Sequence, residues 1–429
     1  MDRYLISGGH VVDPASGLDE KLDVLIEGGK ITDIAHGISC EGAEVYDASG
    51  LYVTPGLVDM HCHLREPGYE YKETIFSGSR AAAAGGYTSI ACMANTDPVN
   101  DDPSVTSFII EKAYGDSPIR VYPVGAVTKG LQGEMLTEMG LMAEAGCVAF
   151  SDDGQPVANS GMMYKALRYA KGFGALVMDH CEDKSLSAGG GMNEGVLSTK
   201  LGLPGVSRAG EEIIVSRDLL LAESLGARVH LSHVSTRGAI ELIRRAKGRG
   251  VSVSCETCPH YIAGTEQLVE GYNTNAKVYP PLRTEDDRQA VIEGLADGTI
   301  DAIATDHAPH HIDEKNVEFM LAANGISAFD TAFSLCYTAL VNEGFLSFMQ
   351  LIKLMALTPA ELLNIEGGRL EKGGAADIAL FDLGAQYTID PARFISAGKN
   401  TPFTGRRVSG RAVGLFCGGR LVMQDGTLL

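Results

Sequence analysis

One unit recurs along the middle of this 429-residue chain: a short apolar strand, a polar or charged end, and then a helical stretch. Helix-compatible stretches cover residues 74–84, 104–114, 162–170, 211–225, 238–247 and 284–295. The expected strands end near His63, Asn95, Thr128, Asp153, His180, His233, His260 and Asp306. Eightfold alternation of strand and helix predicts an α/β fold of the (β/α)8 TIM-barrel type. The main alternative, an open doubly wound sheet, usually carries a glycine-rich phosphate turn, and none of the usual patterns occurs here.

The two ends of the chain have a different pattern. Short alternating strands separated by glycine turns are expected at 4–6, 22–26 and 30–34, and again at 377–382 and 413–422. We therefore predict a small, discontinuous β-sandwich domain of residues 1–54 and 371–429, which flanks a barrel of residues 55–370. Two unrelated β arms are the alternative.

Composition limits the partners of the chain. A formal net charge of −20 and a pI near 4.9 argue against nucleic acid or an anionic membrane as a partner. The first nine residues contain no signal-peptide core, and no apolar run reaches the roughly 18 residues of a membrane span. The nine cysteines do not form a secreted disulfide pattern, and Cys255-x-x-Cys258 has no second pair at zinc-module spacing. A cytoplasmic protein is expected.

Metal-binding residue types are concentrated at the expected strand ends. His61 and His63 are two residues apart, so in an extended strand both imidazoles face the same side. In a barrel, strand ends share one mouth, where active sites lie. The other donors at that mouth are Asp152 or Asp153, His180, His233 and Asp306. Four imidazoles and two carboxylates suit zinc, and a shared carboxylate could bridge two ions. A single such histidine would more often be structural, but the joint occurrence predicts a metal site.

Four motifs in this sequence resemble those of the dihydroorotases of the amidohydrolase superfamily. They are H-x-H-L-R-E-P-G at 61–68, M-A-N-T at 93–96, F-S-D-D-G at 150–154 and D-H-A-P-H at 306–310. The similarity is to the long bacterial form, in which an aspartate on the fourth strand replaces a carbamylated lysine. It implies a zinc enzyme of de novo pyrimidine (UMP) biosynthesis, which reversibly cyclises N-carbamoyl-L-aspartate to (S)-dihydroorotate and water.

The resemblance also implies individual roles for the metal ligands. His61 and His63 would bind one zinc ion, and His180 and His233 would bind the second. Asp153 would bridge the two ions, and Asp306 would bind the first ion and act as the catalytic proton carrier. Asp152 is the less favoured neighbour of the bridging position.

Substrate contacts are implied in the same way. Arg65, Asn95 and His310 would hold the substrate carboxylate, next to His63. The family pattern is broken at two ring-contacting positions, where Tyr279 replaces an asparagine and Asn324-Gly325 replaces Phe-Gly. Residues 311–324 are expected to form a loop over the site.

Two alternatives to dihydroorotase remain. Another cyclic amidohydrolase, an allantoinase or dihydropyrimidinase, would typically carry the carbamylated lysine and lack H-L-R-E-P-G. A non-catalytic partner of aspartate carbamoyltransferase would have lost metal ligands, whereas this chain keeps all six. The sequence leaves open whether one or two metal sites fill. A homodimer is the default expectation for a soluble enzyme, and association with aspartate carbamoyltransferase is a further one.

Overall fold

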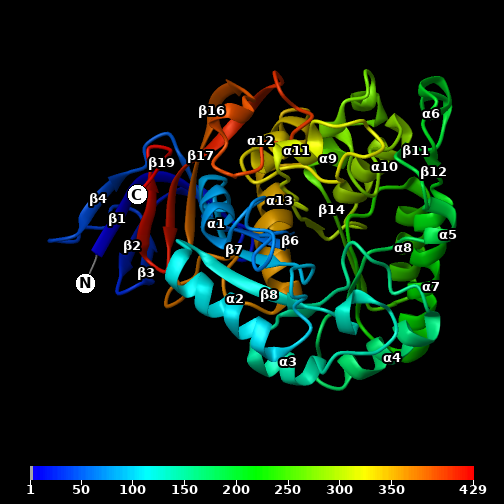
Figure 1. Ribbon diagram of the computed structural model, residues 1–429. Helices are drawn as coiled ribbons and strands as arrows, with labels where there is room; N and C mark the ends of the chain where they lie inside the picture. Colours follow the sequence, from blue (N-terminus) through cyan, green and yellow to red (C-terminus); the bar gives the residue numbers. More distant parts are fainter. Residues whose placement is uncertain (1–2) are drawn as a thin grey trace.

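The computed structural model describes residues 3–429, and its larger part is a barrel of parallel strands (Figure 1). The strands pair in two runs, β6-β7-β8-β9 and β10-β13-β14-β15. Parallel bridges Phe150↔Val177 and Cys62↔His307 join the two runs and close the barrel. The barrel strands are β6 (Leu57–Cys62), β7 (Tyr87–Cys92), β8 (Arg120–Gly125), β9 (Ala149–Phe150), β10 (Met178–Asp179), β13 (Val229–Leu231), β14 (Val253–Thr257) and β15 (Ala302–Ile303). The predicted TIM barrel is confirmed.

All six predicted helices are present, and their ends differ from the predicted ends by at most two residues. They are α1 (Ile75–Ala84), α2 (Pro103–Asp116), α4 (Ser160–Lys171), α7 (Ala209–Leu225), α8 (Arg237–Gly248) and α10 (Glu285–Ala296). Most begin at a polar cap: the Thr74, Thr236 and Thr284 side chains each accept a backbone N–H of the first turn, which satisfies a donor that the helix leaves free.

Further helices were not predicted. Some are short segments in the loops at the barrel mouth: α5 (Lys184–Ser187), α6 (Val196–Leu201), α9 (Pro259–Ala263) and α11 (Ile312–Lys315). The remainder are α3 (Met139–Ala145), α12 (Ala332–Cys336), α13 (Phe348–Ile352) and α14 (Thr358–Leu363). Residues 332–336 are all buried, so this stretch lacks the polar face that makes a helix visible in a sequence. Beside the mouth, the two-residue strands β11 (Met192–Asn193) and β12 (Gly205–Val206) pair with each other.

The two ends of the chain build one sheet beside the barrel (Figure 1). Strand β5 pairs antiparallel with β16, from Tyr52↔Phe381 to Pro55↔Ile378, and so joins the N-terminal strands to the C-terminal ones. The strands are β1 (Arg3–Asp13), β2 (Leu18–Glu27), β3 (Lys30–Ala35), β4 (Glu44–Asp47), β5 (Tyr52–Pro55), β16 (Ile378–Thr388), β17 (Arg407–Cys417), β18 (Arg420–Gln424) and β19 (Thr427–Leu428). A small β unit from both termini is thus confirmed, as one continuous sheet, and two unrelated arms are excluded.

Apolar and ionic contacts fix this sheet to the barrel. The Phe381 ring on β16 stacks on Phe333 of α12, with ring centroids 4.0 Å apart. Arg120 on β8 forms an ion pair with Asp377, next to the start of β16. Within residues 3–429, no helix has the length and apolar character needed to cross a membrane.

Candidate metal centre and active site

The six predicted metal donors lie at the carboxyl ends of five barrel strands. His61 lies in β6 and His63 directly follows it, while Asp153, His180, His233 and Asp306 lie within three residues after β9, β10, β13 and β15. All six are buried, at 5% exposure or less. Parallel strands end at one face, so the topology alone brings these distant residues to one point.

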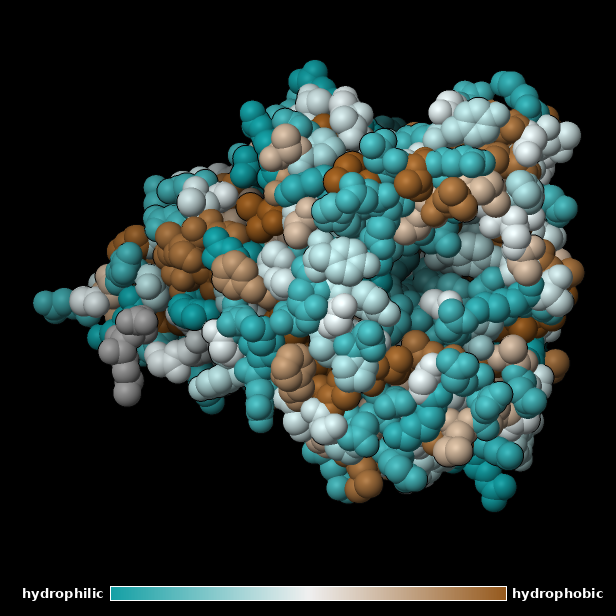
Figure 2. All heavy atoms as spheres, in the orientation of Figure 1, coloured by the Kyte–Doolittle hydropathy of each residue, from teal (hydrophilic) through white to brown (hydrophobic). Residues whose placement is uncertain are grey.

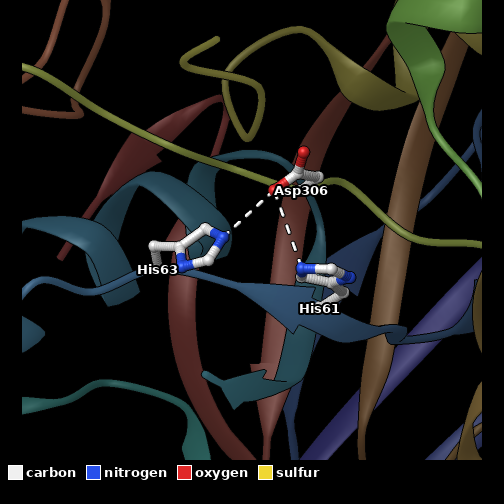
Figure 3. A group of neighbouring side chains, drawn as sticks. All are labelled: His61, His63 and Asp306. Atoms are coloured by element: carbon white, nitrogen blue, oxygen red, sulfur yellow. Dashed lines mark hydrogen bonds and ion pairs between the residues drawn. The ribbon is translucent and has the colours of Figure 1, made fainter. Parts of the chain in front are cut away.

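One group of these side chains consists of His61, His63 and Asp306 (Figure 3). The Oδ1 atom of Asp306 is 3.1 Å from Nε2 of His63 and 3.7 Å from Nε2 of His61. Both ring nitrogens therefore face the same carboxylate oxygen.

Asp153 lies between this group and the other two histidines. Its Oδ1 atom is 3.3 Å from Nε2 of His61, 3.6 Å from Nδ1 of His180 and 3.4 Å from Nε2 of His233. Its Oδ2 atom is 3.4 Å from Nε2 of His63. One carboxylate thus contacts all four imidazoles, which is the position a bridging ligand would need.

The donor set fits metal ions. Two ligands at about 2.0–2.1 Å from a tetrahedral zinc ion lie roughly 3.3 Å apart, close to the separations here. Nε2 of His61 and Oδ1 of Asp153 are buried without a hydrogen-bond partner, so both lack the compensation that a buried polar atom needs. Burial opposes charge on His61, yet Asp153 and Glu256 raise its pKa well above the usual value. The negative charge of Asp153 and Glu256 would likewise attract a metal cation.

Three residues at the mouth have left-handed backbone conformations that are unusual outside glycine. The φ angles are 63° at Arg65, 37° at His233 and 43° at Asp306. Such strain persists only where surrounding contacts impose it, and it is concentrated at functional sites. Here it turns three chemically active side chains toward one opening.

A cavity of about 380 Å³ opens above the donors, and Figure 2 shows the hollow in the barrel half with hydrophilic residues around it. Its lining includes six of the predicted substrate contacts: His63, Arg65, Asn95, Tyr279, Asn324 and Gly325. The half-buried Arg65 donates from Nε to the Pro309 carbonyl at 3.3 Å. Its Nη2 atom lies 3.4 Å from Nε2 of His310, and the remaining N–H groups can bind a carboxylate at the cavity.

His310 is the predicted contact that does not line this cavity. It lines a neighbouring one, and its Nε2 atom donates to the Asn324 carbonyl at 2.8 Å. Burial and the nearby charge of Arg65 lower the pKa of His310 to about 3, so the ring is neutral. In this conformation His310 supports the turn that presents Asn324 and Gly325. Gly325 is required there, because an added Cβ atom would lie 2.5 Å from the Ala308 carbonyl oxygen.

Two further predicted positions have specific neighbours. The Tyr279 ring stacks on His180, with centroids 6.1 Å apart, and burial together with Glu182 raises the pKa of its hydroxyl. Asp152 turns away from the donors, because its Oδ1 accepts the backbone N–H groups of residues 127 and 128 at 2.8 and 2.9 Å. Asp152 therefore shapes the loop after β8, while its neighbour Asp153 faces the centre.

Sequence reasoning missed two carboxylates beside the donor histidines, Glu182 and Glu256. Glu256 Oε1 is 2.6 Å from Nδ1 of His61, and Glu182 Oε2 is 3.2 Å from Nε2 of His180. Glu256 is the one charged residue within β14, and this was the signal for it. For Glu182, two residues after His180, no comparable signal exists.

Comparison with known proteins agrees with this arrangement. The structure superposes on L-hydantoinase (dihydropyrimidinase) from Arthrobacter aurescens with a TM-score of 0.90 and 26% identity, covering 100% of this chain and 98% of that one. The barrel and its donor set define an amidohydrolase, a metal-binding hydrolase of cyclic amides that acts on a small molecule. Residues 50–239 match the family model described as dihydro-orotase-like. The chain belongs to the dihydroorotase family, which serves pyrimidine biosynthesis.

The curated relatives are similar over nearly their full length. The dihydroorotase of Geobacter metallireducens is 54% identical over 98% of this chain and 99% of its own. That of Pelotomaculum thermopropionicum is also 54% identical, over 99% of both chains.

Proposed function

We propose that this chain is a dihydroorotase that binds two Zn²⁺ ions per subunit and interconverts N-carbamoyl-L-aspartate and (S)-dihydroorotate. The observation that carries this proposal is the contact of Asp153 with all four histidines, above which Arg65 lines the cavity. His61, His63 and Asp306 would hold one ion, His180 and His233 the other, and Asp153 would bridge them. When bound, the metal ions supply Lewis acidity, which polarises an amide carbonyl and lowers the pKa of water to about 7.

Asp306 is proposed to carry the proton. Burial raises the pKa of this carboxyl, but the hydrogen bond from His63 and the charge of His61 outweigh burial and lower the pKa to about 2. The carboxylate is therefore ionised at neutral pH and can accept a proton from the attacking water. As the C–N bond of the cyclic amide breaks, Asp306 returns that proton to the leaving nitrogen. The cyclisation runs through the same transfers in reverse.

Arg65 is proposed to bind the free carboxylate of the substrate, with Asn95 and His310 beside it. We expect Arg65→Ala to raise KM for carbamoyl aspartate at least about 10-fold, since a charge-assisted pair contributes roughly 1.5–3 kcal/mol. Arg65→Lys should recover only part of this loss, because an ammonium group cannot form the bidentate hydrogen bonds that a guanidinium forms with the two carboxylate oxygens. Steady-state kinetics in both directions measure the effect. An unchanged KM in Arg65→Ala would place the carboxylate elsewhere.

A hydantoinase-type activity is the second candidate, and the TM-score of 0.90 with an L-hydantoinase favours it. Tyr279, which lines the cavity, is the position where the ring-binding wall could differ. The test is to assay purified, zinc-loaded enzyme on dihydroorotate, allantoin and dihydrouracil. A kcat/KM at least about 100-fold higher for dihydroorotate is expected. A preference for either other substrate would overturn the proposal.

The remaining features of the proposal concern assembly. We propose a cytoplasmic homodimer, with a small β domain of residues 1–54 and 371–429 and a barrel of 55–370, able to associate with aspartate carbamoyltransferase. Retention of all six donors within the barrel mouth argues against a purely scaffolding role. Light scattering of the chain alone and mixed with the transferase tests both assemblies.

A further inference from the structure

We infer that Glu256 and Glu182 are positioning residues that fix His61 and His180 in opposite tautomers, each securing a different one of the two metal ions. This inference rests on the proposed two-metal function, and it explains what orients two of the histidine ligands. Neither carboxylate is among the six donors.

Glu256 is enclosed between two histidines at the barrel core. Its side chain is fully buried, with Oε1 2.6 Å from Nδ1 of His61 and Oε2 3.2 Å from Nε2 of His230. The far side of the His230 ring is held in turn, because its Nδ1 is 2.8 Å from Oγ of Ser254. These four contacting side chains come from three strands: His230 lies in β13, Ser254 and Glu256 lie in the neighbouring β14, and His61 lies in β6. A buried carboxylate is costly unless it is paired, and His61 is the histidine that forms a hydrogen bond with Glu256.

Glu182 contacts His180 as Glu256 contacts His61. Its Oε2 atom is 3.2 Å from Nε2 of His180, and its Oε1 accepts the Ser187 hydroxyl at the end of α5. The Tyr279 ring stacks on a face of the His180 ring. Glu182 therefore restrains the imidazole from the cavity wall, whereas Glu256 restrains His61 from the core.

The two contacts select different ring nitrogens for the metal. A nitrogen that binds a metal ion must offer its lone pair, so the single N–H of a neutral, metal-binding imidazole lies on the other nitrogen. In His61 and His180 that other nitrogen faces a glutamate carboxylate, which accepts the N–H. His61 then directs the lone pair of Nε2 toward Asp153 and Asp306, and His180 directs that of Nδ1 toward Asp153. Such outer contacts typically change metal affinity by about 10–100-fold.

The test uses the full chain with each glutamate replaced by methionine, which fills similar space without an acceptor, and by glutamine, which keeps one. Affinity for Zn²⁺ is measured by chelator competition, and Co²⁺ absorption reports the environment of each site. Glu256→Met and Glu182→Met should each weaken one site about 10–100-fold and leave the other tight, and the double variant should weaken both. The glutamine variants should recover part of the affinity.

A tautomer measurement separates positioning from simple loss of structure. In zinc-loaded protein labelled with ¹⁵N-histidine, the N–H should lie on Nδ1 of His61 and on Nε2 of His180, and each methionine variant should lose the downfield hydrogen-bond shift of that proton at its own histidine. Glu73→Gln is the matched control, because Glu73 is as buried as Glu256 and lies 3.4 Å from Nε2 of His307. The Nδ1 atom of His307 accepts the backbone N–H groups of residues 328 and 329, so this ring is not one of the six proposed metal ligands. It should alter the melting temperature and leave both zinc affinities unchanged.

Unchanged zinc affinity in both methionine variants would overturn the inference. If either methionine variant fails to fold, an unchanged affinity in the corresponding glutamine variant, with unaltered Co²⁺ absorption, would overturn it equally. The proposed function fails separately: wild-type protein that binds two Zn²⁺ ions but does not turn over dihydroorotate would refute the activity and leave the role of the two glutamates intact.

Discussion

Replacing Asp306 by alanine should lower kcat by about 10³-fold or more in both directions, while the chain stays folded and keeps at least one metal ion. The reason is that Asp306 is an ionised carboxylate at the mouth whose Oδ1 faces His61 and His63, whereas Asp153 is shared among four histidines, so Asp306 is available for proton transfer. General acid–base catalysis typically contributes about 10²–10⁴-fold, and loss of a metal contact adds to this. Steady-state kinetics together with metal analysis of the purified variant measure the effect.

A matched control lies at the other end of the same strand. Asp301 precedes β15 and pairs with Lys247, with Nζ 2.6 Å from each carboxylate oxygen. Asp301→Asn removes a charge of the same kind far from the mouth, so it should lower stability and leave kcat within about 2-fold of the wild type. Activity near the wild-type level in Asp306→Ala would refute Asp306 as the proton carrier.

Asp153→Ala is expected to have the second large effect, loss of the paired metal site and of measurable turnover. Its carboxylate contacts all four donor histidines, so its removal takes away the anion that joins the His61–His63 pair to His180 and His233. Loss of an outer contact alone costs about 10–100-fold in metal affinity, and loss of the shared donor should exceed that. Zinc stoichiometry after dialysis against a weak chelator, with a dihydroorotate assay, measures both effects.

The neighbouring aspartate serves as the control. Asp152→Asn keeps an oxygen for the two backbone N–H groups after β8 and removes a charge one residue from Asp153. It should lower stability by about 1 kcal/mol and keep two bound zinc ions. Two tightly bound ions in Asp153→Ala would contradict the bridging role.

Much of the fold was readable because it depends on local pattern. The alternation of apolar strands with helices, bounded by caps such as Thr74 and Thr284, predicted the barrel and six of its helices. The helix at 332–336 was missed, because complete burial removes the polar face on which periodicity depends. The helices α13 and α14 have only 5 and 6 residues, too few to show a helical period.

For the site, the sequence supplied the donor types and their places at strand ends. The structure then brought His61, His63, Asp153, His180, His233 and Asp306 within contact distance of one another. Their roles as ligands remain predictions. His310 illustrates the limit: its motif suggests a substrate contact, yet its ring is bonded to Asn324 beside a second cavity.

The sequence alone determined which chemical groups stand at each strand end, because strand periodicity and chain order are local properties. Only the tertiary structure decided which nitrogen of each imidazole faces the centre and which contacts turn Asp152, the neighbour of Asp153, away from it. Those choices depend on Glu256, Glu182 and the backbone amides after β8, partners that closure of the barrel brings in from other strands.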